Sequence, residues 1–340
     1  MIDKFKELLQ QSNKLLVSAH TSPDPDAVAS LLLLGTTLEA NFPDKQVSMV
    51  LEEEPDGLDF LSAYDKIRFQ PMLEATEELK PELIILVDSN GYDRVSRHDG
   101  QKIKDYIAAN GVKTAIIDHH EPDDKDEADV YINSGNPAAV QEIYELCFDS
   151  LRLKKPEGYA QTTMLGLYAD SGGFAYQNPR FRQTLVLATD LVDAGANIEQ
   201  IKNHINQYTE EGMRVIAELA LNLSHGADYT YTYLGDDFVT GWVQSGKSLP
   251  ALHSSRKKFV NDYIRSIDGR QWGFVISLDP QEDERTYSVS LRSVGGGKDV
   301  ADIAKKLDGG GHKASAGGKV QAASVEEALQ KVQEVISQSD

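Results

Sequence analysis

The stretch Ile116-Ile117-Asp118-His119-His120 ends an apolar run with one acid and two imidazoles. Two earlier apolar runs end in the same way, the run 15–20 at His20 and the run 83–88 at Asp88. Apolar runs of this length indicate buried strands, and open α/β folds build their sites where such strands end. Asp and His are ligands of divalent metals. The sequence therefore predicts a metal enzyme.

Strand and helix signals alternate through residue 195, which predicts an α/β fold with a doubly wound, mainly parallel sheet. Strands are expected at 14–19, 46–51, 83–88, 113–118 and 129–133, and helices at 27–41, 100–109, 138–151, 158–169 and 180–194. We expect residues 1–195 to form the catalytic metal-binding domain, and residues 196–226 to form a helical linker.

Residues 227–340 have a different pattern, which predicts a smaller α+β domain. Its strands are expected at 228–234, 238–243, 273–278, 286–292 and near 318–321, and its helices at 256–267, 299–307 and 325–337. Two glycine clusters separate the strand at 286–292 from the final helix.

The chain has 340 residues, which is more than one hydrophobic core usually serves and favours two domains. Its formal net charge is −20. Residues 241–320 hold 13 Lys and Arg against 9 Asp and Glu, so this segment is mildly basic within an acidic protein. That balance favours a small anionic ligand over long duplex DNA. Acidity that only keeps the protein soluble is the alternative interpretation.

We expect a cytoplasmic protein with no membrane partner. No apolar run approaches the roughly 18 residues that a membrane span needs, and the first residues lack the apolar core of a signal peptide. The single cysteine, Cys147, fits a reducing compartment. It lies in a helical run and is expected to be a core residue rather than a catalytic thiol.

The first strand leads into a turn that contains His20, Asp24 and Asp26 and is restricted by Pro23 and Pro25. One of these acids would suffice as a helix cap. Two acids and an imidazole in seven residues exceed that need, so we interpret all three as metal ligands.

Three further positions complete the predicted ligand set. Asp88 and His119 follow apolar runs, and Asp170 ends a helical run, where a nearby cation would offset the unfavourable helix dipole. A turn-starting aspartate at 88 and a loop acid at 170 are the simpler alternatives. Four carboxylates and two imidazoles suffice for two ions that share one carboxylate, the usual device for attack on a phosphorus ester. Such ligands suit Mn²⁺ or Mg²⁺.

These motifs resemble those of the DHH phosphoesterase superfamily. The motifs match at His20, Asp24 and Asp26, at Asp88, at Asp118-His119-His120, and at Asp170. The C-terminal domain resembles the DHH-associated nucleic-acid-binding domain through two stretches, Ser290-Leu291-Arg292-Ser293 and the glycine-rich run from Gly309 to Gly318.

The resemblance implies a role for each position. One Mn²⁺ would be held by His20, Asp24 and Asp88, and the other by Asp26, Asp88, His119 and Asp170. His120 would lie beside the reacting phosphate, and Asp118 would orient an imidazole. Substrate phosphate would be bound by Arg292, Gly309, Gly310, Gly311 and His312, although a plain turn after the helix 299–307 is the simpler interpretation of the glycine run.

Two positions depart from the family pattern. Ser171 stands where relatives often have Thr, which keeps the hydroxyl. Asp308 stands where relatives often have a further Gly, and it places a negative charge beside the expected phosphate site.

The resemblance implies metal-activated hydroxide attack that hydrolyses short single-stranded oligonucleotides, or small nucleotide phosphates, to mononucleotides. A phosphatase acting on 3′-phosphoadenosine 5′-phosphate and a phosphodiesterase acting on cyclic or linear dinucleotides are the alternatives within the family. Substrate length would be measured between the metals and a phosphate anchor on the other domain. Relatives are often dimers, so a homodimer is one expected assembly.

Two interpretations from other classes remain. Residues 241–248 match the phosphate-loop pattern of nucleotide-binding ATPases, but Pro250 disfavours the helix that should follow, and residues 242–243 resemble the end of a strand. A nucleotide-binding module without turnover is the other alternative, and the complete metal set disfavours it.

Overall fold

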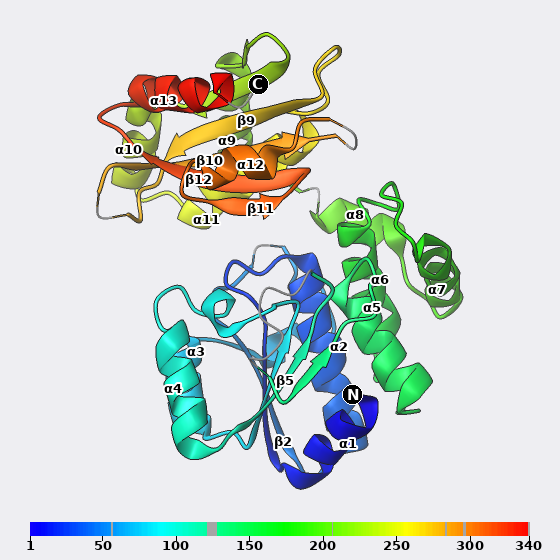
Figure 1. Cartoon of the computed structure of the whole chain (residues 1–340). Coiled ribbons are helices and arrows are strands. Elements are labelled where there is room, and N and C mark those ends of the chain that lie inside the picture. The colour runs from blue at the N-terminus through cyan, green and yellow to red at the C-terminus, as the bar shows by residue number, and fades with distance from the viewer. Residues whose placement is uncertain (56, 121–127, 206, 283, 295–296, 339–340) are drawn as a thin grey trace. The chain divides into compact units, whose positions relative to one another are not determined.

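The computed structural model describes residues 1–55, 57–120, 128–205, 207–282, 284–294 and 297–338 (Figure 1). The chain divides into two compact units, the N-terminal unit Met1–Gln207 and the C-terminal unit Tyr208–Asp340. Each unit has its own six-stranded sheet. The division falls inside the segment 196–226 that was expected to be a linker.

The sheet of the N-terminal unit has the strand order β3-β2-β1-β4-β5-β6, and every neighbouring pair is parallel. Its strands are β1 (Lys14–Ser18), β2 (Gln46–Leu51), β3 (Ile67–Phe69), β4 (Leu83–Val87), β5 (Lys113–Ile117) and β6 (Val130–Ile132). This confirms the doubly wound parallel sheet. The direction of the strand order reverses between β1 and β4, the point at which open α/β sheets bind ligands.

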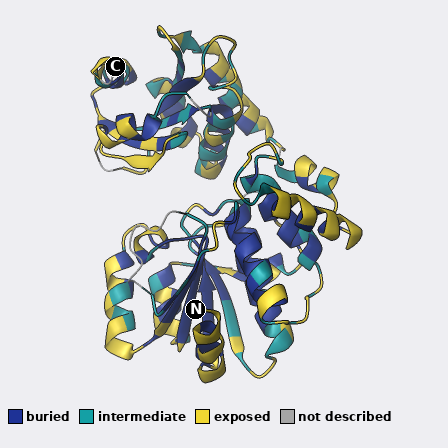
Figure 2. Ribbon diagram, turned by 45° about the vertical axis from the view of Figure 1, so that its right-hand side comes forward, coloured by how far each residue is buried: buried dark blue, intermediate teal, exposed yellow. Residues whose placement is uncertain are grey.

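Helices cover both faces of this sheet, because alternate side chains of each strand point to opposite faces (Figure 1). Leu15 and Val17 of β1 belong to one core with α1, α2, α5 and α6, whereas Leu16 belongs to the other core with α3 and α4. Figure 2 shows the central strands largely as buried, and most residues of α2 are buried as well. The helices are α1 (Ile2–Gln11), α2 (Pro25–Asn41), α3 (Met72–Leu79), α4 (Gly100–Asn110), α5 (Ala139–Tyr144), α6 (Tyr159–Asp170), α7 (Phe181–Asp193) and α8 (Ile198–Ile205), with the short helices η1 (Tyr64–Lys66) and η2 (Tyr92–Arg94) and the π-helix η4 (Glu145–Ser150).

The sheet of the C-terminal unit is mixed, with the order β11-β12-β10-β9-β8-β7. Its strands are β7 (Ser224–His225), β8 (Tyr229–Leu234), β9 (Trp272–Leu278), β10 (Thr286–Ser293), β11 (Gly310–His312) and β12 (Ser315–Gln321). Helices α12 (Val300–Lys305) and α13 (Val325–Ser337) share a core with one face, and α9 (Glu210–Leu221), α10 (Asp236–Gln244) and α11 (Leu249–Asp262) share a core with the other. The expected α+β domain is confirmed. Among the described residues, no helix has the length and apolar character that crossing a bilayer requires.

The strand expected at 238–243 is wrong, because these residues lie in α10. Val239 and Trp242 are the buried residues of this segment. They lie three positions apart, which is the spacing of one helix face rather than of a strand. Asp236 and Asp237 occupy the first turn, where the helix dipole favours acids. Several short elements, among them β3, α3, β7 and β11, were not expected.

The same finding removes the phosphate-loop interpretation of residues 241–248. A phosphate loop follows a strand, whereas this segment ends one helix and begins another. The hydroxyl of Ser248 caps α11 by accepting from the N–H of Ala251 at 3.2 Å. The ammonium of Lys247 lies 4.9 Å from the centre of the Trp242 ring. The loop therefore serves as a helix-helix connection.

Candidate metal centre

Eight side chains meet at the carboxyl edge of the N-terminal sheet, around the switch point between β1 and β4. They come from the turn after β1, the start of α2, the ends of β4 and β5, and the end of α6. We call them the carboxylate–histidine cluster: His20, Asp24, Asp26, Asp88, Asp118, His119, His120 and Asp170. The fold thus brings together every metal-ligand and catalytic residue that the sequence predicted in this unit.

The first group within the cluster is His20, Asp24 and Asp88, whose ligand atoms lie within 4.8 Å of one another. The Nε2 atom of His20 is 3.4 Å from Asp88 Oδ2 and 4.0 Å from Asp24 Oδ1. Its Nδ1 atom is 2.7 Å from the carbonyl oxygen of Thr21, which fixes the orientation of the ring. Nε2 is therefore the nitrogen that faces the two carboxylates.

The second group is Asp26, His119 and Asp170, again with ligand atoms within 4.8 Å of one another. His119 Nε2 lies 3.2 Å from Asp170 Oδ2 and 3.3 Å from Asp88 Oδ1. Asp88 therefore presents one carboxylate oxygen to each group, which is the arrangement of a shared ligand.

The two acids of the first turn each have a backbone partner. Asp24 caps α2, because its Oδ1 accepts from the N–H groups of Asp26 and Ala27 at 3.1 and 3.2 Å. Asp26 is fully buried, and its two oxygens accept from the N–H groups of Ala139 and Val140 at 2.6 and 3.1 Å. Capping and membership of the cluster are thus compatible, since a carboxylate has lone pairs for both.

Asp118 and His120 form a pair just after β5, and together with Asp88 and His119 they make a third group whose ligand atoms lie within 4.8 Å of one another. Asp118 is fully buried, and its Oδ1 lies 2.9 Å from His120 Nδ1. The ring of His120 also lies against that of His119, with centroids 4.3 Å apart. The contact with Asp118 therefore orients the imidazole of His120.

The cluster brings ionisable groups together where they are largely shielded from water, and this shifts the pKa values of its members. Burial lowers the pKa of His20, but the hydrogen bond to Asp88 and the neighbouring carboxylates outweigh it and raise the pKa to about 9. The same balance raises the pKa of His119 to about 10. Burial and the charge of Asp88 raise the pKa of Asp26 to about 8. Burial also opposes ionisation of Asp88, but His119 and His20 hold its pKa well below the usual range.

The donor set fits divalent cations. Asp88 Oδ1, Asp118 Oδ2 and His119 Nε2 are buried and have no hydrogen-bond partner of good geometry among the described residues. Buried polar atoms without partners are costly. A cation held by Asp88 and His119 would use two of these atoms, Asp88 Oδ1 and His119 Nε2, and oxygen-rich ligation with a few imidazoles suits Mn²⁺ or Mg²⁺.

One supporting network escaped the sequence analysis. Arg97 Nε donates to Glu53 Oε1 at 2.6 Å, and the hydroxyl of Ser22 donates to Glu53 Oε2 at 3.1 Å. Ser22 has a left-handed backbone, φ +55°, within the turn that carries His20 and Asp24. The network ties that turn to two distant segments, and no local pattern at these three positions signals it.

The predicted phosphate-binding residues lie in the C-terminal unit, and the structure divides them into two kinds. Gly310 and His312 are exposed on β11, and Arg292 lies on β10. Gly309 and Gly311 instead press against β12: a Cβ at 309 would meet the carbonyl oxygen of Gly317, and one at 311 would lie 2.6 Å from Ala316 Cα. Close backbone packing therefore accounts for these two glycines.

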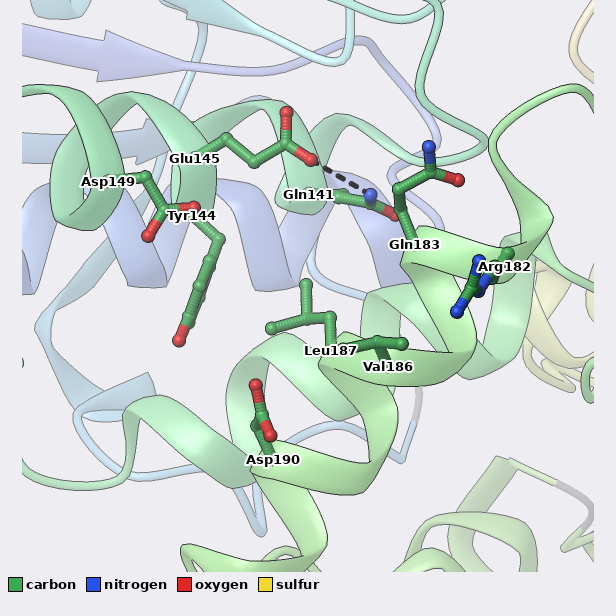
Figure 3. Close-up of a pocket in the computed structure, with 9 residues that line it drawn as sticks. All are labelled: Gln141, Tyr144, Glu145, Asp149, Arg182, Gln183, Val186, Leu187 and Asp190. Atoms are coloured by element: carbon green, nitrogen blue, oxygen red, sulfur yellow. Dashed lines mark hydrogen bonds between the residues drawn. The ribbon is translucent and has the colours of Figure 1, made fainter.

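A separate hollow of about 460 Å³ lies on the helical side of the N-terminal unit (Figure 3). Side chains of α5, η4 and α7 line it, and the Gln141 amide donates to Glu145 across its wall at 3.0 Å. No member of the carboxylate–histidine cluster lines this hollow.

A parallel sheet that gathers carboxylates and imidazoles at its switch point is typical of metal-dependent enzymes of the α/β class. Residues 14–168 match the N-terminal domain of the DHH family, and residues 251–338 match the DHHA1 domain. The two matches together span well over half of the chain. The chain belongs to the DHH family of phosphoesterases, which confirms the resemblance noted in the sequence.

Known proteins agree with this assignment. The chain is 26% identical over 312 residues to the "bifunctional oligoribonuclease and PAP phosphatase NrnA" of Mycoplasma pneumoniae, covering 91% of this chain and 88% of that protein. It is 24% identical to the "cyclic-di-AMP phosphodiesterase PdeA" of Listeria monocytogenes, covering 95% of this chain and 47% of that protein. A solved exopolyphosphatase-related protein from Bacteroides fragilis has the same fold, with a TM-score of 0.81 at 22% identity over 99% of this chain and 94% of that one.

Proposed function

We propose that this protein hydrolyses short oligoribonucleotides, or small nucleotide phosphates, to mononucleotides with the help of two Mn²⁺ ions. The observation that carries the proposal is the position of Asp88, which faces His20 with one oxygen and His119 with the other. The first group would hold one ion, and Asp26, Asp88, His119 and Asp170 the second. The relative named as an oligoribonuclease and PAP phosphatase supports this substrate class.

Two bound divalent ions would supply Lewis acidity, which lowers the pKa of water and offsets phosphoryl charge. Residues of the chain would supply proton donation and would position the other groups of the site. His120, held by Asp118, would donate a proton or hydrogen bond at the reacting phosphate. Backbone N–H groups of Ala139 and Val140 hold both carboxylate oxygens of Asp26 in position.

We propose that Arg292, Gly310 and His312 bind a substrate phosphate, with Gly309 and Gly311 shaping their loop. Arg292→Ala or His312→Ala should raise KM about ten-fold or more, as expected for loss of a charge-assisted hydrogen bond, with a smaller effect on kcat. Arg214→Ala, which removes an exposed arginine of α9, is the matched control. Unchanged KM for a dinucleotide in both variants would contradict the anchor.

The decisive experiment is a product time course on a panel of labelled substrates. The panel contains RNAs of two to ten nucleotides, matching DNAs, 3′-phosphoadenosine 5′-phosphate and cyclic dinucleotides. Mononucleotide release from the short RNAs in Mn²⁺, lost with a chelator, supports the proposal. Parallel reactions in Mg²⁺ identify the preferred ion. Binding without release of product from any substrate would point to a nucleotide-binding module instead.

A phosphodiesterase acting on cyclic or linear dinucleotides is the second candidate. The relative from Listeria monocytogenes favours it, although this chain spans about half of that protein. Faster turnover of cyclic dinucleotides than of linear dinucleotides in the same panel would make this the main activity. We also propose a cytoplasmic location and a homodimer, which fractionation and light scattering would test.

A further inference from the structure

One face of the C-terminal sheet is polar across three neighbouring strands. Tyr287, Val289 and Leu291 of β10 point into the core with α12 and α13, so the alternate residues point to the opposite face. The registers of β10, β12 and β11 place six residues on that face: Ser290, Arg292, Gly310, His312, Ser315 and Gly317. We call this the phosphate face, because it holds the three residues of the proposed anchor.

The phosphate face is open above its glycines and bordered by a helix. A Cβ built on Gly310 meets no described atom within 4 Å, and one built on Gly317 meets only a carbonyl oxygen at 3.5 Å. Helix α11 packs on the same side of the sheet, where it shares a core with Val275 of β9. Asn261 of α11 accepts from Arg292 Nε at 2.7 Å, so the helix also positions the anchor arginine.

Arg256 lies on α11 five residues before Asn261, which is about 7.5 Å along the helix axis. Its side chain is half-buried, and its guanidinium makes no hydrogen bond or ion pair with any residue that the structure describes. Burial lowers the pKa of Arg256, and the carboxylate of Asp279 is the neighbouring charge that opposes this. Asp279 is itself engaged, accepting from the hydroxyl of Ser288 on β10 at 3.3 Å.

An arginine in this setting needs an acceptor. A guanidinium offers five N–H donors and has no neutral form in proteins, and withdrawing it from water without acceptors costs free energy. Its planar fork matches the oxygens of a phosphate. Arg256 thus has the donors for an anion. Its neighbour Asp279 contacts Ser288, which lies two residues along β10 from Ser290 of the phosphate face.

We propose that Arg256 binds a second, non-reacting phosphate of the substrate, one step along the phosphate face from the phosphate held by Arg292 and His312. This inference rests on the proposed function. It assigns a preference: ligands with an additional terminal phosphate bind more tightly than the same ligands without it, and Arg256 is the residue that distinguishes them.

The test compares two-nucleotide RNAs with and without a terminal phosphate, at the 5′ end in one pair and at the 3′ end in another. Steady-state kinetics of the full-length protein in Mn²⁺ give KM and kcat for each ligand, and calorimetric titration gives the affinities independently of turnover. The variants are Arg256→Gln, Arg256→Lys and the control Lys257→Gln, which removes the exposed charge of the next residue on α11. Thermal melting verifies that each variant folds.

In the unchanged protein, the additional phosphate should tighten binding about ten-fold in at least one pair, the scale of one charge-assisted hydrogen bond. Arg256→Gln should abolish that ratio with little change in kcat, Arg256→Lys should restore part of it, and Lys257→Gln should retain it. A ratio that survives Arg256→Gln, or a ratio of one in the unchanged protein for both pairs, overturns the role of Arg256. Absence of turnover for every ligand overturns the proposed function instead, while the titrations still decide the role of Arg256.

Discussion

Asp88 combines a strained backbone with a central position in the cluster. Its φ is +50°, in the left-handed region that non-glycine residues seldom adopt, at a cost of order 1 kcal/mol. The N–H of Asp88 donates to the carbonyl oxygen of Ile117 on the neighbouring strand at 3.0 Å, which helps to hold this conformation. Strain of this kind is typical of functional sites. Here it turns one carboxylate toward both halves of the cluster.

Asp118 should act by positioning His120 and not by binding an ion directly. Replacing Asp118 with Asn keeps the shape but weakens the charged hydrogen bond at 2.9 Å. We expect kcat to fall about 10- to 100-fold, as for other residues that orient a catalytic imidazole, with Mn²⁺ affinity nearly unchanged by calorimetry. Asp105→Asn, at an exposed position of α4, is the control. A loss of Mn²⁺ binding that matches the loss of rate would identify Asp118 as a ligand.

Asp308 adopts φ +50°, at a position where relatives often have glycine. Asp308→Gly and Asp308→Asn both tolerate this conformation and remove a negative charge beside the proposed anchor. We expect KM to fall roughly two- to five-fold in both variants, the size of an exposed charge interaction. The change should shrink at high salt, because salt screens it. KM values that are equal to those of the unchanged protein at low salt would show that this charge does not reach the substrate.

The packing of α6 on α2 and α5 determines where Asp26 lies. Gly166 of α6 faces these helices, and a Cβ at this position would meet Asp26 Oδ1 and lie 2.7 Å from Val140 Cγ1. The carboxylate of Asp26 cannot shift away from an added Cβ, because N–H groups at the N-terminus of α5 donate to both of its oxygens. The close approach of three helices at one glycine thus places Asp26 within the second group.

Gly166→Ala should therefore lower both stability and activity. We expect a loss of about 1–3 kcal/mol from overpacking, together with weaker Mn²⁺ binding, measured by denaturant unfolding and calorimetry. Gly241→Ala is the matched control, because Gly241 also lies in a helix but has no described atom within 4 Å of the added Cβ. It should be neutral or stabilising by about 0.5–1 kcal/mol. Equal effects of the two substitutions would show that the contact with Asp26 is unimportant.

The stability of the whole protein should depend on pH without metal and much less so with metal. The pKa values of His20, His119 and Asp26 are raised to about 9, 10 and 8, so the folded protein binds these protons more tightly than the unfolded chain. In a chelator, the free energy of unfolding should fall as pH rises from 6.5 to 9, by at least ~1 kcal/mol, the equivalent of one pKa unit at one group.

Excess Mn²⁺ should remove this decline, because the deprotonated ligands then hold ions and binding stabilises the folded state. Thermal and urea unfolding at a series of pH values, with chelator or Mn²⁺, measure both curves. The variant His119→Asn should have a shallower slope in chelator. A slope that is identical with and without Mn²⁺ would count against an ion in the cluster.

Much of this protein was predictable from local sequence. Apolar runs ending at His20, Asp88 and Asp118 indicated strands with ligands at their carboxyl ends, and β1, β4 and β5 lie there. Such signals are local, since a strand end and the residue after it are neighbours in the chain. Short elements and the α10 segment were missed, because a few residues of alternating character fit a strand and a helix equally well.

The sequence by itself determined the class of each unit and the chemistry of its ligand set, because side-chain type and periodicity are properties of single segments. Tertiary structure alone decided which segments meet. It placed Asp26 against the N-terminus of α5, more than a hundred residues away, and gave Arg292 a partner on α11. It also showed that Gly309 and Gly311 serve the packing of β11 on β12. These outcomes depend on contacts between distant parts of the chain, and no local pattern encodes such contacts.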